Sequence, residues 1–180
     1  ALDWCRERNR QGIHCIVDPL GEYARNQGQA SRSVKAYTEA AEAIAREGLN
    51  ASLSVKTTAL GASFDASLCR ANALALLGEA RDRGVGFGVD VEGRGMVQPT
   101  LELAGQLGER YPITLALQAY LNRTPSDLGR VLGTPIRPRL VKGAYAGDLS
   151  DFGQIQLCLE GHVDQASASS RPFSLGTHDP

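Results

Sequence analysis

The chain has 180 residues, of which 42% are hydrophobic and 22% are charged, and its formal net charge at pH 7 is −1. These values are typical of a soluble globular domain that can bury a sizeable core. Lys and Arg are scattered along the chain, without the one-sided basic stripe of a nucleic-acid binder, so nucleic acid is excluded as an expected partner.

The four cysteines form no CxxC pair and have no His at metal-ligand spacing, which disfavours a disulfide framework and a zinc site. No stretch approaches the roughly 18 to 20 apolar residues of a membrane span, and the start ALDWCRERNRQ lacks the apolar core of a signal peptide. A cytoplasmic location is therefore expected. The sequence begins without Met and stops directly after a predicted strand, so we expect a fragment of a longer protein.

Short runs rich in Val, Ile and Leu alternate with segments of helical periodicity, which is typical of parallel βα units. Six such units are predicted, within a single domain over residues 1–180. In chain order we expect the helix Leu2 to Arg8, strand Ile13 to Pro19, helix Ser31 to Leu49, strand Ser52 to Ala59, helix Asp65 to Arg83, strand Gly86 to Glu92, helix Thr100 to Arg110, strand Ile113 to Tyr120, helix Ser126 to Leu132, strand Arg137 to Tyr145 and strand Pro172 to His178. The segment Gln154 to Ser170 allows a helix, but its end QASASS is typical of a loop.

Six βα units fit either an open doubly wound sheet or a (β/α) barrel, and periodicity alone does not decide between them. No GxGxxG follows the first strand, and polar residues end every strand rather than clustering at one switch point; both features favour the barrel. In a barrel these strand ends form one rim, where active sites lie. The rim residues are Asp18, Glu22, Lys56, Thr57, Thr58, Asp90, Glu92, Gln118, Tyr120, Arg139, Lys142, Tyr145, Thr177 and His178.

Six segments, one at each predicted strand, resemble motifs of the proline dehydrogenase family in sequential order. RLVKGAY at Arg139 to Tyr145 resembles the fifth-strand motif, and LALQAYLNRT at Leu115 to Thr124 resembles the fourth. RLVKGAY and the LQAYL within the second segment are the most specific matches. The others are DPLGE at Asp18 to Glu22, SVKTTALG at Ser54 to Gly61, VDVEG at Val89 to Gly93 and LGTHDP at Leu175 to Pro180. Together the matches extend over nearly the whole chain.

This resemblance implies an α/β fold, a (β/α)8 TIM-type barrel of the proline dehydrogenase kind, with about six of its eight βα units present. It also implies non-covalently bound FAD and the oxidation of L-proline, or a close analogue, to 1-pyrroline-5-carboxylate, the first step of proline catabolism. Electrons would pass to a quinone through peripheral contact with a membrane, the inner membrane of a bacterium or of a mitochondrion.

By the same resemblance, Lys56 would hold the substrate carboxylate, Tyr145 would pack near the substrate ring, and Asp90 would lie beside substrate and flavin. The resemblance implies cofactor contacts for Gln118, Arg139, Val141, Gly143, Thr177 and His178, and a substrate gate at Glu22. A fixed guanidinium suits the negative charge that a reduced flavin accumulates, and hydride transfer needs neither nucleophile nor metal.

Alternation along a strand predicts the direction of Lys142. It is three residues after Arg139, so the two side chains lie on opposite faces of the strand. If Arg139 points inward, Lys142 points outward. Tyr120 can be interpreted as a residue that fills the core, and His162 as structural.

The resemblance implies that the eighth strand and the last helix bring paired arginines to the substrate carboxylate, and this chain is expected to lack them. Six units cannot close a barrel, so the chain by itself is expected to be inactive. Two other hypotheses stay open at this point. One is a Schiff-base barrel enzyme like class I aldolases, with Lys56 or Lys142 as nucleophile and Asp18 or Asp90 as proton shuttle. The other is a truncated or degenerate barrel without catalysis.

Overall fold

A computed structural model describes residues 1–177 of the chain. Its elements in chain order are α1 (Leu2–Arg10), β1 (Cys15–Val17), α2 (Gln27–Arg46), β2 (Ala51–Lys56), η1 (Thr58–Leu60), α3 (Ala66–Asp82), β3 (Gly86–Asp90), η2 (Arg94–Met96), α4 (Val97–Gly108), β4 (Ile113–Gln118), α5 (Thr124–Leu132), β5 (Arg137–Val141), α6 (Phe152–Ala168) and β6 (Ser174–Gly176). The strands are neighbours in the sheet in chain order. The pairs β1 with β2, β4 with β5 and β5 with β6 are parallel, which confirms the predicted α/β class.

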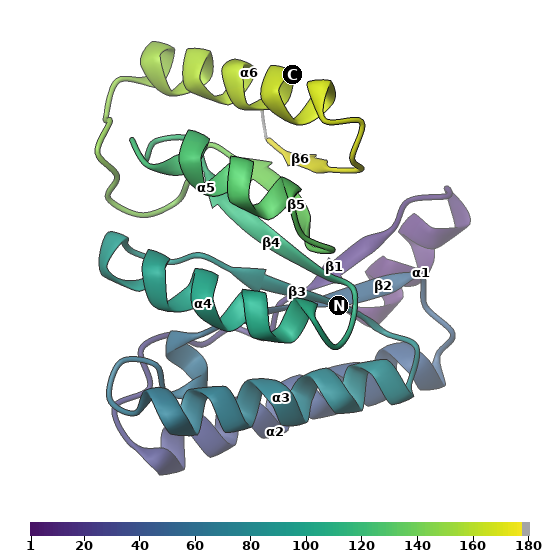
Figure 1. The fold of residues 1–180 in the computed structure, drawn as a ribbon. Coiled ribbons are helices and arrows are strands. Elements are labelled where there is room, and N and C mark those ends of the chain that lie inside the picture. The colour runs from purple at the N-terminus through teal and green to yellow at the C-terminus, as the bar shows by residue number, and fades with distance from the viewer. Residues whose placement is uncertain (178–180) are drawn as a thin grey trace. The chain divides into compact units, whose positions relative to one another are not determined.

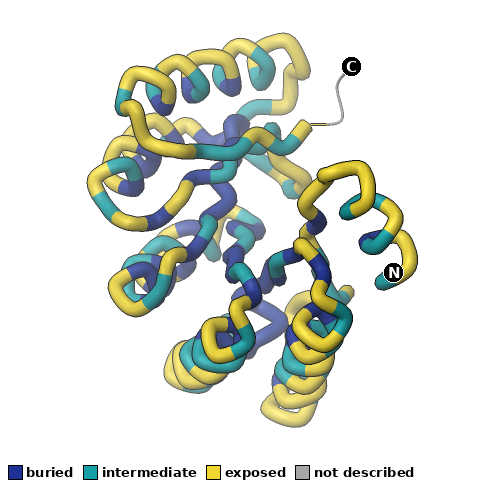
Figure 2. The backbone as a smooth tube through the Cα atoms, turned by 90° about the vertical axis from the view of Figure 1, so that its right-hand side faces the viewer, coloured by how far each residue is buried: buried dark blue, intermediate teal, exposed yellow. Residues whose placement is uncertain are grey.

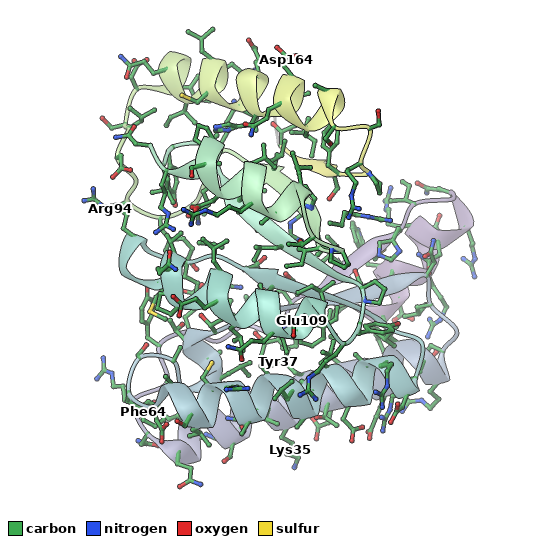
Figure 3. All side chains as sticks on the ribbon, in the orientation of Figure 1. Lys35, Tyr37, Phe64, Arg94, Glu109 and Asp164 are labelled. Carbon is green, nitrogen blue, oxygen red and sulfur yellow. The ribbon has the colours of Figure 1, made fainter. Side chains whose placement is uncertain are left out.

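The chain divides into two compact units, Ala1–Gly88 and Val89–Pro180, and each is described by itself. In the first unit α2 and α3 lie side by side (Figure 1). Both begin at a side-chain cap, because Asn26 accepts from the N–H of Gln29 and Asp65 from that of Leu68. On α2, Tyr37 is buried while Lys35 points into solvent (Figure 3). The apolar face of α2 therefore packs inward, as its sequence periodicity predicts.

In the second unit α5 packs against α6, and both contact β5 (Figure 1). The segment that ends in QASASS is helical as far as Ala168, since Asp151 caps its start and Leu159, His162 and Ala166 are buried at spacings of three and four. Figure 2 shows buried residues concentrated on the strands and on the helix faces turned toward them. Burial of this face fixes the helix even though its end is polar.

Every strand is shorter than the sequence predicts. The chain after Lys56 turns at once into η1, and the chain after Val141 leaves the sheet for the loop before α6. Apolar runs mark the buried segment, whereas a strand ends where its ladder of hydrogen bonds ends. The predicted active-site residues consequently lie at strand ends and in the loops that follow them.

Within residues 1–177 no helix is both long and apolar enough to cross a membrane.

Candidate active site

In the first unit, Lys56 forms an ion pair with Asp18 at the carboxyl ends of β2 and β1. The register pairs Ile16 with Ser52, and residues two apart on a strand share a face, so Asp18 and Lys56 lie on the same face. Lys56 is only 9% exposed, and its backbone N–H donates to the Tyr37 hydroxyl at 3.2 Å. The pair thus holds a buried ammonium group at the end of the strand that the sequence singled out.

In the second unit, Arg139 of β5 forms an ion pair with Asp90 at the end of β3. The two side chains are 15% and 20% exposed, so both are partly shielded from water. A charge pair in such surroundings is held more rigidly than one on an open surface. The structure therefore brings together two of the residues that the sequence predicts to contact substrate and cofactor.

Gln118, the last residue of β4, is 4% exposed and lies on the same sheet face as Arg139. Its side-chain nitrogen donates to the carbonyl of Val91 at 2.6 Å. Its other side-chain atom, Oε1, is buried and has no hydrogen-bond partner in the part of the chain that the structure describes. A buried acceptor without a donor is costly, so the Oε1 atom of Gln118 is available to accept a hydrogen bond.

The remaining predicted residues of this region follow β5. Val141 ends the strand and lies opposite Gln118 in the register, Gly143 has a positive φ of 124°, and Tyr145 is half-buried in the loop. Lys142 points to the face of the sheet opposite Arg139. Its ammonium group stacks on the Phe152 ring of α6, 3.8 Å from the ring centroid. This contact confirms that Lys142 points to the helix side of the sheet.

Two further predicted residues, Glu22 and Thr177, are exposed. Glu22 is exposed in the loop after β1, where it lines a hollow of about 400 Å³ together with Arg25 and Arg32. Thr177 is exposed just after β6. His178 lies outside the described residues, so its predicted cofactor contact stays a prediction.

Two polar contacts on the rim of the second unit escape sequence reasoning. Arg94 of η2 pairs with Asp148 in the loop after β5 at 2.7 Å, and Asp148 also accepts from the backbone N–H of Asn122 at 2.9 Å. That N–H, together with the Arg94 guanidinium, holds the pKa of Asp148 below its ordinary value. The two residues are 54 positions apart and belong to no motif, so the sequence does not indicate that they pair.

The family model described as proline dehydrogenase matches residues 1–148, which include every strand except β6. Proline dehydrogenase 1 of Bacillus subtilis strain 168 is 31% identical over 146 residues, which are 81% of this chain and 48% of the relative. Proline dehydrogenase 2 of the same strain is 32% identical with the same coverage. The chain spans about half the length of the curated relatives it matches.

Solved structures of proline utilization A have a similar fold. The protein from Bdellovibrio bacteriovorus aligns with a TM-score of 0.84 at 17% identity and covers 97% of this chain and 24% of its own. A mutant of the Bradyrhizobium japonicum protein aligns with a TM-score of 0.80 at 23% identity, over 92% of this chain and 21% of its own. At these identities the likeness shows the fold alone, and it confirms the predicted barrel class.

Proposed function

Because the chain belongs to the proline dehydrogenase family, we propose that the protein carrying it oxidises L-proline to 1-pyrroline-5-carboxylate by hydride transfer to FAD. The observation that carries this proposal is the face shared by Gln118 and Arg139. There a buried amide oxygen, which has no hydrogen-bond partner among residues 1–177, lies on the strand next to an ion-paired guanidinium. The chain covers 48% of the relatives' length, so the activity and its partners are proposed for the whole protein.

The residues of the second unit fit a flavin. Gln118 Oε1 can accept a hydrogen bond from a ring N–H, and Arg139 offers positive charge on the same face, where negative charge on a reduced ring is stabilised. Gly143 has no side chain, and Val141 supplies an apolar surface beside Gln118. We propose that these four residues, with Thr177 and His178, hold the cofactor.

Substrate contacts are proposed for Lys56, Asp90, Tyr145 and Glu22. Lys56 is a buried ammonium paired with Asp18, and an ammonium suits a carboxylate ligand. Asp90 is held in place by its ion pair with Arg139. The phenol ring of Tyr145 offers a flat surface for a pyrrolidine ring, while exposed Glu22 is proposed as the gate.

In this mechanism, the bound flavin supplies the acceptor for a hydride and its two electrons. The residues of the chain contribute position: a fixed charge for the carboxylate, a surface against the ring, and shielding of the reacting carbon from water. Proline must react as the free amine, because the C–N bond gains double-bond character as hydride leaves the adjacent carbon. Release of the product as an imine needs no nucleophile from the protein.

A Schiff-base mechanism has less support. The amine of a Schiff-base lysine must be free to attack a carbonyl, whereas the Lys56 amine is engaged in an ion pair with Asp18. Lys142 faces the opposite side of the sheet and stacks on Phe152. Borohydride trapping with a carbonyl substrate is expected to leave both lysines unmodified.

We further propose that a quinone is the electron acceptor, reached from the cytoplasmic side by peripheral contact with the membrane. Family membership supports this assignment. Turnover of L-proline with a soluble quinone is expected to be faster than turnover with oxygen alone. Equal rates would contradict the assignment.

The experiment that tests the proposed function is an absorption spectrum of the full-length natural protein before and after anaerobic addition of L-proline. We expect flavin bands that bleach with L-proline and persist with D-proline. If the protein binds no flavin after incubation with FAD, or if the bands do not respond to L-proline, the proposal fails.

A further inference from the structure

Tyr120 lies two residues after the end of β4 and is 4% exposed. Around it runs the β5–α6 loop, residues 142–151, which carries Gly143 and Tyr145. The Tyr120 hydroxyl accepts a hydrogen bond from the backbone N–H of Tyr145 at 3.0 Å. A phenylalanine would fill the same space, so the packing of the ring does not account for this hydroxyl.

The backbone of Tyr120 binds the same loop at both ends. Its N–H donates to the carbonyl of Lys142 at 3.2 Å, and its carbonyl accepts from the N–H groups of Asp148 and Leu149 at 3.0 and 3.1 Å. With the hydroxyl contact, four hydrogen bonds join one buried residue to the start, middle and end of the loop. Such a set of contacts fixes the course of the loop far more than one contact would.

Two glycines let the loop approach the ring this closely. A Cβ atom at Gly143 would lie 1.7 Å from Cε1 of Tyr120, and one at Gly147 would lie 2.2 Å from Cδ2. Gly143 also has a φ of +124°, which side chains rarely tolerate. The loop is therefore shaped to the Tyr120 ring, with Tyr145 between the two points of closest approach.

An ion pair closes the loop from outside. Asp148 accepts from the Arg94 guanidinium and from the backbone N–H of Asn122, two residues after Tyr120 (Figure 3 labels Arg94). Tyr145 is thus held between a buried hydroxyl on one side of its backbone and a salt-bridged loop end three residues later.

From these contacts we propose that Tyr120 is a positioning residue, whose hydroxyl holds Tyr145 at the place where the substrate ring binds. The inference rests on the proposed function, because the substrate ring that Tyr145 contacts is taken to be that of proline. It gives Tyr120 a role beyond the core packing that the sequence indicates. Tyr120 acts through Tyr145 and itself need not contact substrate.

The test is a double-mutant cycle in the full-length protein with Tyr120→Phe, Tyr145→Ala and the two changes combined. Tyr120→Phe is expected to raise KM for L-proline about fivefold, the effect of one lost hydrogen bond, with kcat changed by less than about twofold. In the Tyr145→Ala background the same change is expected to have no further effect on KM, because its target is gone. Tyr111→Phe, at a half-buried tyrosine just before β4, is the matched control and is expected to leave KM unchanged.

Flavin content and melting temperature are measured on each variant. Asp148→Asn loosens the same loop without altering Tyr120, and it is expected to raise KM in the same direction. An unchanged KM in Tyr120→Phe, in a protein whose flavin L-proline still bleaches, overturns this inference alone. The inference is also overturned if Tyr120→Phe raises KM equally in the wild type and in Tyr145→Ala. A variant that loses flavin and stability without a change in KM overturns it as well. A wild-type protein that L-proline does not bleach overturns the proposed function.

Discussion

Lys56 combines two properties that rarely occur together, since its side chain is nine-tenths buried and it is a cation at a strand end. Burial of an ammonium is costly unless charges or hydrogen bonds compensate, and the ion pair with Asp18 supplies such a charge. A buried cation held in this way is ready to take a carboxylate without further loss of side-chain entropy.

Replacing the charge of Lys56 is therefore expected to weaken proline binding. In Lys56→Met, KM for L-proline should rise by about 10- to 100-fold, which corresponds to about 1.5–3 kcal/mol for a hydrogen bond to a charged group. Lys35→Met is the control, because Lys35 lies on the exposed face of α2. Steady-state kinetics of both variants check the prediction, and equal KM values for the wild type and Lys56→Met would contradict it.

For single residues, the sequence marks candidates at the strand ends, whose chemical roles stay predictions, and it does not predict which partners they have. Motifs select Lys56 and Arg139, and alternation gives the direction of Lys142 correctly. The partners Asp18 and Asp90 are visible as polar strand ends, but pairing depends on register, which one sequence does not specify. The contact of Arg94 with Asp148 joins η2 to the loop after β5, and no local sequence pattern indicates it.

Among the elements, α4 packs closely on the start of β5 through a residue without a side chain. A Cβ atom at Gly108 would lie 2.6 Å from Cγ1 of Ile136, which is buried. Gly105, one turn earlier on the same helix, has nothing within 4 Å of such an atom.

The two glycines give a matched pair of alanine substitutions. Gly108→Ala is expected to destabilise the fold by about 1–3 kcal/mol through overpacking. Gly105→Ala should stabilise it by about 0.5–1 kcal/mol, because alanine has the higher helix propensity. Denaturant unfolding measures both changes, and effects of the same sign would refute the packing described for α4.

The packing of α6 predicts a pH dependence of stability. Burial lowers the pKa of His162 below its ordinary value, and its Nδ1 atom has no hydrogen-bond partner within residues 1–177. As the pH falls below about 6.5, the unfolded chain takes up a proton that the folded chain binds less readily, so stability decreases. His162→Leu should remove this decrease. Melting temperatures between pH 8 and 5 test it, and equal slopes in the two proteins would exclude the effect.

Every predicted helix and strand is present, and the doubtful segment before β6 is a helix. The QASASS end indicates a loop, because serine is typical of loops. The segment is nevertheless helical, because Leu159, His162 and Ala166 are buried on one face. Strand ends are predicted too late, since the apolar run continues into η1 after Lys56 and the hydrogen-bond ladder does not.

For the whole molecule, parallel strands in chain order and the likeness to proline utilization A agree with the family match. Periodicity alone leaves an open sheet and a barrel as alternatives, because both consist of βα units. The order of strands distinguishes them, since a doubly wound sheet reverses direction at a switch point and this sheet does not.

The most direct test of the central claim is the rate at which deuterated L-proline bleaches the flavin in an anaerobic single turnover of the full-length protein. We predict slower bleaching with deuterium at C5, the carbon that becomes part of the imine, and an unchanged rate with deuterium at C2. Slowing by deuterium at C2 alone, or the absence of bleaching with any form of proline, would contradict the proposed reaction.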